Sequence, residues 1–286
     1  MSKLRLMTQN QWNQTSNLPF WESIGIDCSS AVREKGHVRV AKELMPDIIG
    51  GQEINIEMQQ DFKFYCMDEN LPYTIIWGNM TPLIYRADKL ELLDTEYIVY
   101  PEKIEGLPEL YNDVKSKAAN LGVFRCKEDG KVFIFVTTHL WWMHEDVPKD
   151  HWWYREGSDK AREFQIKMLI DLAEKYQAKY DNCPIFVVGD LNTKYDSKAV
   201  QYALNERGFS HAHDIATDYA CETNGCHDCF QHSYTPDWDP KPFSEAIDHI
   251  LVKDLGDGVV RRFERYTPEY YLPLSDHAPT YIDVEI

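Results

Sequence analysis

Residues 184–192 read Pro184-Ile185-Phe186-Val187-Val188-Gly189-Asp190-Leu191-Asn192. The apolar run after the proline predicts a buried strand that ends at Asp190. Residues two apart in an extended segment point the same way, so Asp190 and Asn192 are expected to face a common centre. A carboxylate after a strand is more often a helix cap or a turn residue, and this segment alone therefore establishes no site.

Other predicted strands also end in polar groups. Strands are expected at residues 4–10, 47–53, 246–252 and 278–286, a strand pair at 73–77 and 81–85, and a hairpin at 123–126 and 132–139. The polar groups at or beside strand ends are, in chain order, Asn10, Glu53, His139, Asp190 with Asn192, Asp248 with His249, and Asp276 with His277. Because strand ends are rigid, they can hold side chains within the small tolerance of catalysis. The set as a whole predicts one catalytic site.

Helical spacing of apolar residues predicts helices at residues 32–45, 56–66, 159–180 and 199–207. Residues 97–120 contain two prolines and no clear period, and we interpret them as a surface excursion over the sheet edges. Strands and helices alternate without internal repeats or a linker. We therefore expect a single α/β domain with mixed sheets over residues 1–286.

The composition is typical of a globular protein, with 43% hydrophobic and 27% charged residues. No run of apolar residues approaches the ~20 that a bilayer requires, and residues 1–10 lack the apolar core of a secretory signal. A cytoplasmic location is expected, and secretion after removal of a signal is the alternative left open.

Seven cysteines are present. Free cysteine behaves as a small buried hydrophobe, and this description fits the four that lie in or beside apolar segments, Cys28, Cys66, Cys126 and Cys183. The odd number and scattered positions favour a reducing compartment. A zinc site is conceivable at a cluster formed by Cys221, Cys226 and Cys229 with His227 and His232. Because a second Cys-x-x-Cys pair is missing, a cysteine-containing loop is the favoured interpretation.

Lysine and arginine number 30 against 47 aspartate and glutamate, which gives a formal net charge of −17. Such a surface repels a polyanion at long range and disfavours duplex DNA as a partner. The effect is partial, because carboxylates that hold a cation are counted in that charge.

The residue types at the strand ends suit phosphate chemistry beside a metal ion. The doublets Asp248-His249 and Asp276-His277 each offer a hard oxygen ligand and an imidazole that can stabilise phosphate charge. Signatures of a serine or cysteine nucleophile are absent, and so is a Gly-x-x-x-x-Gly-Lys phosphate loop. The pattern favours a site that holds a cation and stabilises the charge of a phosphate.

Six motifs follow one another along nearly the whole chain: Met7-Thr8-Gln9-Asn10, Pro46-Asp47-Ile48-Ile49-Gly50-Gly51-Gln52-Glu53, Val136-Thr137-Thr138-His139-Leu140, Val188-Gly189-Asp190-Leu191-Asn192, Ile247-Asp248-His249-Ile250 and Leu274-Ser275-Asp276-His277-Ala278-Pro279. With these motifs the chain resembles the endonuclease/exonuclease/phosphatase superfamily, the deoxyribonuclease-like metal phosphoesterases. The resemblance implies a four-layer α/β sandwich, in which two mixed β-sheets pack face to face with helices outside and the site lies at one end of the sheets.

The resemblance also implies a metal site. Glu53 would bind Mg²⁺ or Mn²⁺, as one or two ions, with Asn10 nearby and Asp276 as a further ligand. Oxygen ligands of this kind suit a hard divalent ion.

Catalytic roles are implied for five residues. Asp190 would orient or deprotonate the attacking water, Asn192 would hold a phosphate oxygen, and His139 would contact the phosphate. His277 would be the second imidazole, and Asp248 would accept a hydrogen bond from it and fix its tautomer.

Substrate choice depends on loops, because one fold hosts many substrates. Trp141 and Trp142 follow His139, and further rings follow at His144, His151 and Trp152-Trp153-Tyr154; they would either stack on a substrate ring or cover the sheet edge as core. Lys117 and His249 are further candidates for substrate contact. The other basic residues near the motifs are interpreted mostly as solvated charges: Arg33, Lys35, Arg39, Lys115, Arg155, Lys160 and Arg162.

The acidic surface and the aromatic rim favour a small phosphodiester or phosphomonoester, such as a sugar phosphate or a nucleotide. A deadenylase-like nuclease or an endonuclease would need a positive track, and a sphingomyelinase-like phosphodiesterase would need an exposed apolar surface. A catalytically inactive binding or scaffold protein is the non-enzymatic alternative. Loss of the polar site residues would indicate it, and all of these positions are filled.

Overall fold

The computed structural model describes residues 2–286 except 14, 16–22, 24, 26, 219–229, 232–240, 243–245, 257–258, 267 and 272–273. Its elements are, in chain order, β1 (Lys3–Asn10), α2 (Ser30–Leu44), β2 (Ile48–Gln52), α3 (Ile56–Asp68), β3 (Tyr73–Ile76), β4 (Leu83–Arg86), β5 (Leu90–Val99), β6 (Ala118–Cys126), β7 (Val132–His139), α4 (Ser158–Lys179), β8 (Ile185–Asp190), α5 (Lys198–Glu206), β9 (Ser210–His211), α6 (Ala212–Ile215), β10 (Phe230–Gln231), β11 (Lys241–Pro242), β12 (Asp248–Lys253), β13 (Val260–Arg265), a 3-10 turn (Glu269–Tyr271) and β14 (Thr280–Glu285).

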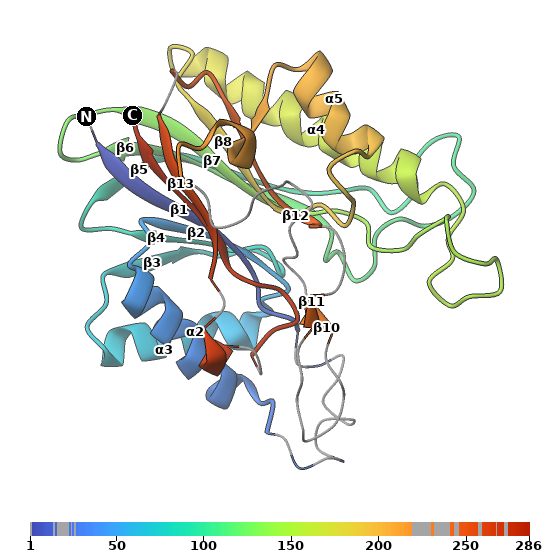
Figure 1. Cartoon of the computed structure of the whole chain (residues 1–286), viewed down its shortest axis with the longest axis horizontal. Coiled ribbons are helices and arrows are strands. Elements are labelled where there is room, and N and C mark those ends of the chain that lie inside the picture. The colour runs from blue at the N-terminus through green and yellow to red at the C-terminus, as the bar shows by residue number, and fades with distance from the viewer. Residues whose placement is uncertain are drawn as a thin grey trace.

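Two six-stranded sheets form the centre of the fold, with strand orders β13-β14-β1-β2-β4-β3 and β5-β6-β7-β8-β12-β9. Figure 1 shows four layers: α4 and α5 lie on one outer face, the two sheets lie between, and α2 and α3 lie on the other outer face. Each sheet is mixed, because β1–β2 and β7–β8 pair in parallel and the other pairs are antiparallel. The predicted four-layer α/β sandwich is confirmed.

Separate apolar clusters hold the layers together. Leu6 and Ile48 of the first sheet pack with Phe135, Phe186 and other residues of the second, and this cluster joins the sheets face to face. A second cluster packs α4 and α5 on one sheet, and a third packs α2 and α3 on the other. Both faces of the central strands are thus covered, which explains why β8 is buried at every residue and reads as a continuous apolar run.

Two glycines allow backbone to approach closely at the site end of the sheets. Gly189 has φ +148°, and a Cβ there would lie 2.0 Å from the carbonyl oxygen of Thr138 on the neighbouring strand. A Cβ at Gly50 would lie 2.6 Å from Cγ2 of Val188, across the interface between the sheets. Larger side chains at either position would push apart the strands that carry the polar residues.

The sequence predicted most elements near the centre of the fold within a few residues. It missed β5 and β13, and residues 97–120 were interpreted wrongly: β5 runs to Val99 and β6 begins at Ala118. The intervening segment is more than a surface excursion, because Tyr100 and Tyr111 are buried in it. Because the backbone of this segment is irregular, the spacing of its apolar residues gave no sign of this packing.

Cys28, Cys66, Cys126 and Cys183 are free and buried, as predicted. The cluster at Cys221, Cys226 and Cys229, for which zinc was considered, lies outside the described residues. In the part of the chain that the structure describes, no helix is both long enough and apolar enough to traverse a bilayer.

Candidate active site

Strand register brings the predicted polar residues to one end of the two sheets. In the second sheet His139 lies opposite Asp190 across the parallel pair β7–β8, and Asp190 lies opposite Asp248 across the pair β8–β12. In the first sheet Asn10 lies opposite Gln52, so Glu53 follows at the same edge. The site is therefore built at the carboxyl ends of two parallel strand pairs that face each other.

Asp190 is the residue that the other side chains of the site surround. It is 2% exposed, and its carboxylate accepts hydrogen bonds from the backbone N–H of Asn192 (2.8 Å) and from Nδ2 of Asn10 (3.0 Å). Nε2 of His139 lies 3.5 Å from the same carboxylate, and Nε2 of His277 lies 3.9 Å away. Burial raises the pKa of Asp190 above its ordinary value, while His277 and Lys117 oppose that rise. A carboxylate in this setting is a stronger proton acceptor than one in water.

Glu53 is linked to Asp190 through one amide. Nδ2 of Asn10 donates to Glu53 Oε1 over 3.3 Å as well as to Asp190, and the backbone N–H of Asn13 donates to Glu53 Oε2 over 3.0 Å. Glu53 has φ +57°, an uncommon conformation for a residue with a side chain. The surrounding structure holds Glu53 in this strained conformation, and the conformation directs its carboxylate toward the site.

His277 is hydrogen-bonded to a buried carboxylate. Its Nδ1 lies 2.6 Å from Oδ2 of Asp248, so Nδ1–H donates to Asp248 and Nε2 faces Asp190. Ser275 fixes the preceding backbone, since its hydroxyl donates to the carbonyl of Asn10 (2.7 Å) and accepts from the N–H of His277 (3.1 Å). The two segments that supply Asn10 and His277 are thereby held together.

His139 contacts a buried lysine. Nζ of Lys117, which is 4% exposed, lies 2.8 Å from Nε2 of His139. Burial lowers the pKa of His139 well below its ordinary value, and the positive charges of Lys117 and His277 act in the same direction. Burial also lowers the pKa of Lys117, although Glu53, Asp113 and Asp190 oppose this. A neutral imidazole beside an ammonium group is a suitable partner for an anionic phosphate.

Hard oxygen ligands are available for a divalent cation. Glu53, His139 and Asp190 offer ligand atoms within 4.8 Å of one another. Burial raises the pKa of Asp276 to about 6; His277 opposes this rise, and Glu53 adds to it. Oδ1 of Asp276 is buried and has no hydrogen-bond partner among the described residues. The carboxylates of Glu53 and Asp190 and the imidazole of His139 are ligands that a divalent ion accepts, so the residues present fit a metal site.

Two residues expected to contact substrate are placed elsewhere. Trp141 is 3% exposed and packs with Ile104, Tyr111 and Ala161, so its ring belongs to the core. His249 is 1% exposed and hydrogen-bonds His211 and the carbonyl of Thr193, which argues against a substrate contact and makes it a support of the chain after Asn192. Side-chain alternation along β12 explains why Asp248 faces the site and His249 does not.

Asn192 makes hydrogen bonds within the site through both its backbone and its side chain. Its N–H donates to Asp190, and one N–H of its side-chain amide donates to the carbonyl of Leu140 over 3.1 Å. The second amide hydrogen leaves a donor for a phosphate oxygen.

The sequence did not single out Arg33, which was grouped with solvated charges. Arg33 is 3% exposed, and its guanidinium donates to the carbonyls of Gln11, Trp12 and Leu274. It therefore links the chain after Asn10 to the chain before Ser275, the same two segments that Ser275 joins. Its position at the start of a helix gave no sign of this role, whereas Ser275 lies inside a motif and could have been noticed.

Comparison with known proteins identifies the family. The model of the Endonuclease/Exonuclease/phosphatase family matches residues 35–277. A search of curated protein sequences finds no significant match.

Solved structures of low sequence identity share the fold. An endonuclease/exonuclease/phosphatase from Bacteroides vulgatus is 22% identical, covers 100% of both chains and has a TM-score of 0.71. A mannosyl-6-phosphatase from Bacteroides thetaiotaomicron is 18% identical, with 99% of this chain and 100% of that chain covered and a TM-score of 0.68. The human Nocturnin catalytic domain is 17% identical, with 99% and 94% covered and a TM-score of 0.64. The chain belongs to the endonuclease/exonuclease/phosphatase family and is a phosphoesterase hydrolase.

Proposed function

We propose that this chain hydrolyses a small phosphate ester at the site around Asp190, with Mg²⁺ or Mn²⁺ bound beside Glu53. The observation that carries the proposal is the surroundings of Asp190: an amide on one side links it to Glu53, and two imidazoles lie within 4 Å of its carboxylate. This arrangement combines a buried base, a cation site and groups that stabilise phosphate charge.

The cation would be held by Glu53 and Asp276, with Asn10 positioning Glu53 through its amide. When bound, a divalent ion would neutralise charge on the phosphate and favour ionisation of a nearby water. It would also favour the ionised form of Asp190 over the protonated form that burial promotes.

In the proposed reaction, Asp190 accepts a proton from water, and the water oxygen forms a bond to phosphorus. The bond from phosphorus to the leaving oxygen breaks on the opposite side, and that oxygen takes up a proton from solvent, to which Asp190 then releases the proton it accepted. His139 and Lys117 would contact the phosphate oxygens with the remaining amide hydrogen of Asn192, and His277 would stabilise charge as the transition state forms. Asp248 would keep His277 in the orientation that this requires.

A small ester fits the chain better than a nucleic acid does. The formal net charge of −17 opposes a polyanion, while a single phosphate requires only the local positive charge of Lys117. Among the proteins of like fold, one is a mannosyl-6-phosphatase, which agrees with a small phosphomonoester.

Phosphate or alcohol release from a panel of esters tests this proposal. We expect turnover of bis-p-nitrophenyl phosphate and of several sugar phosphates or nucleotides in Mg²⁺ or Mn²⁺, and loss of turnover to background in EDTA. RNA and sphingomyelin vesicles belong in the same panel. Faster cleavage of either would replace the proposed substrate class, and absence of metal-dependent turnover on every ester would favour the scaffold alternative.

A further inference from the structure

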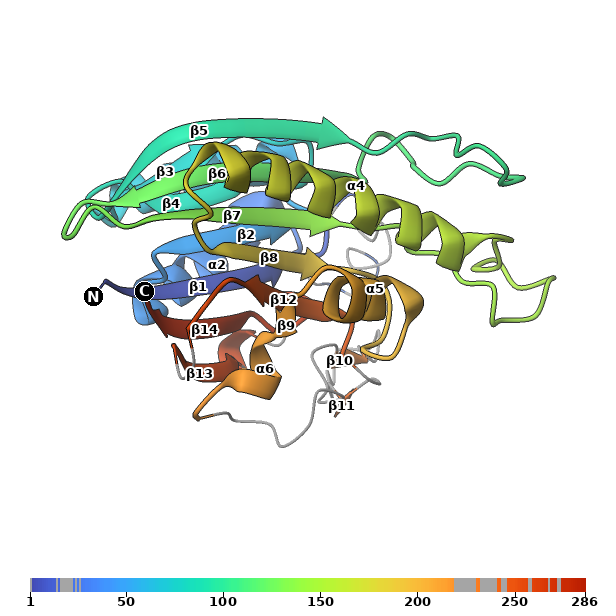
Figure 2. The ribbon, with the colours of Figure 1, turned by 90° about the horizontal axis from the view of Figure 1, so that it is seen from above.

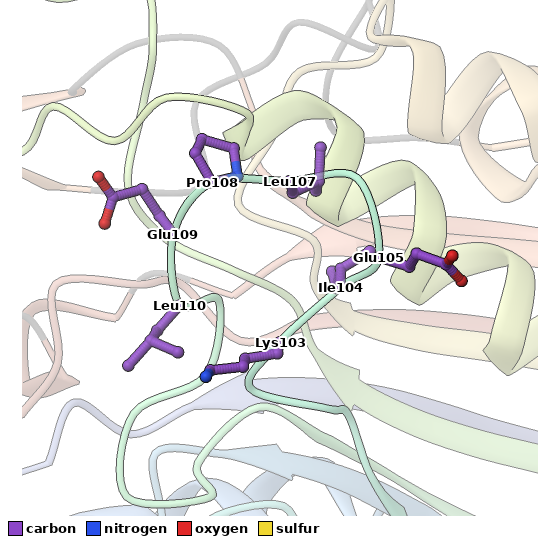
Figure 3. Close-up of a pocket in the computed structure, with 7 residues that line it drawn as sticks. All are labelled: Lys103, Ile104, Glu105, Leu107, Pro108, Glu109 and Leu110. Carbon is purple, nitrogen blue, oxygen red and sulfur yellow. The ribbon is translucent and has the colours of Figure 1, made fainter.

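Two loops extend beyond the strand ends on the side of the catalytic site. They are residues 100–117, between β5 and β6, and residues 140–157, between β7 and α4 (Figure 2). A surface hollow of about 580 Å³ is lined by residues 103–105 and 107–110 of the first loop alone (Figure 3), and no catalytic candidate lines it. The second loop carries the rings that the catalytic mechanism leaves without a role.

The rings of this second loop form a connected cluster, defined here as Trp142, His151, Trp152 and Trp153. Ring centroids lie 6.0 Å apart for Trp142–Trp152 and 5.0 Å apart for Trp152–Trp153, and His151 stacks on Trp152 with centroids 6.1 Å apart. Trp152 is 68% exposed, and Trp142 and Trp153 are half-buried. Single exposed rings are ordinary on a protein surface, whereas rings gathered in one cluster offer a contiguous apolar face to a ligand.

The loop that carries the cluster is held in place by several contacts. The N–H of His144 donates to the carbonyl of Trp153 (3.0 Å), and the N–H of Gly157 donates to the carboxylate of Glu145 (2.6 Å). The guanidinium of Arg155 pairs with Glu109 of the other loop over 2.9 Å. A braced loop presents its rings at low cost in conformational entropy, as a binding surface requires.

A short series of contacts connects the cluster to the catalytic site. Nε1 of Trp142 donates to Oδ2 of Asp113 over 3.1 Å, and the other carboxylate oxygen accepts from the hydroxyl of Ser116 over 2.6 Å. Ser116 precedes Lys117, whose Nζ contacts His139. Trp142 also follows His139 by three residues, so the loop that carries the cluster begins at the strand end that carries this catalytic candidate.

We infer that the cluster of Trp142, His151, Trp152 and Trp153 is a stacking platform for the sugar ring of a phosphorylated carbohydrate. This inference rests on the proposed function, because it places the substrate's phosphate at Asp190. The C–H face of a sugar ring packs on an indole, and sugar hydroxyls donate to carboxylates, two of which, Asp146 and Asp150, are exposed on the same loop. The segment 141–157 carries more acidic than basic residues, which favours a neutral ring over groups with further phosphates.

The test compares kcat/KM for mannose 6-phosphate and glucose 6-phosphate with that for ringless glycerol 2-phosphate. We expect the wild-type chain to prefer at least one sugar phosphate, and Trp152→Ala to reduce that preference about tenfold, mostly through KM, since one stacking contact has about this effect. Trp152→Phe should restore most of the preference. Phe64→Ala, which removes an exposed ring from α3, is the matched control and should leave the preference unchanged.

Several results would overturn the inference. Equal losses for sugar phosphates and glycerol 2-phosphate would give Trp152 a structural role only. A preference for AMP that Trp152→Ala abolishes would assign the cluster to a base instead of a sugar. If no ester is hydrolysed, the proposed function fails, and the cluster is tested separately by quenching of tryptophan fluorescence with mannose 6-phosphate: quenching that Trp152→Ala removes supports it, and no quenching refutes it.

Discussion

Asp190→Asn is expected to lower kcat/KM for phosphate esters by about 10³-fold, within the range of ~10²–10⁴ for loss of a positioned general base. The amide keeps one acceptor oxygen for the N–H of Asn192 and loses the second oxygen, which accepts from Nδ2 of Asn10. Because the amide has nearly the volume of the carboxylate, the packing of this 2% exposed side chain changes little. What disappears is the group that can take a proton from water. Steady-state phosphate release in Mg²⁺ or Mn²⁺ measures the effect.

Asp196→Asn is the matched control for this prediction, because Asp196 is an exposed aspartate in the loop after Asn192. It should retain wild-type activity, and both variants should keep the thermal unfolding midpoint of the wild type within a few degrees. Substantial turnover by a folded Asp190→Asn variant would remove Asp190 from its role as base.

Glu53→Gln is expected to weaken binding of Mn²⁺ and to reduce kcat/KM by about 10²–10³-fold at a fixed metal concentration, the usual effect of losing one group that stabilises the transition state. Gln keeps an oxygen for the backbone N–H of Asn13 but loses the negative charge. Part of the activity should return at high Mn²⁺, since weaker binding is overcome by mass action.

Calorimetric titration with Mn²⁺ measures the loss of metal affinity in Glu53→Gln directly. Activity measured against metal concentration gives the metal dissociation constant independently. Glu57→Gln changes an exposed glutamate at the start of α3 and should titrate as the wild type does. Unchanged affinity in Glu53→Gln would show that the ion is held elsewhere.

The sequence predicted most of the site because strand ends carry its chemistry. Asp190 follows an apolar run, and Glu53 and His139 follow two others, so local patterns place each at the end of a rigid element. What the patterns could not supply is the pairing of strands that brings these ends together. The parallel pairs β1–β2 and β7–β8 depend on contacts between distant parts of the chain.

What the sequence did not show has the same physical origin. Lys117 was named as a candidate for substrate contact, but it ends an irregular segment, and no period reveals its burial against His139. Arg33 was grouped with solvated charges, yet three backbone carbonyls from distant segments surround it. Trp141 and Trp142 are adjacent in sequence, and only the structure separates a core ring from a half-buried one.

The position of the metal ion tests most directly whether these distant segments form one catalytic centre. Crystals of the wild-type chain grown with Mn²⁺ and a phosphate ester analogue would locate the ion by anomalous scattering. We expect an anomalous peak about 2–2.5 Å from a carboxylate oxygen of Glu53, with the phosphate group between Asp190 and His139. An ion bound away from Glu53, or a phosphate bound outside this cluster, would contradict this expectation.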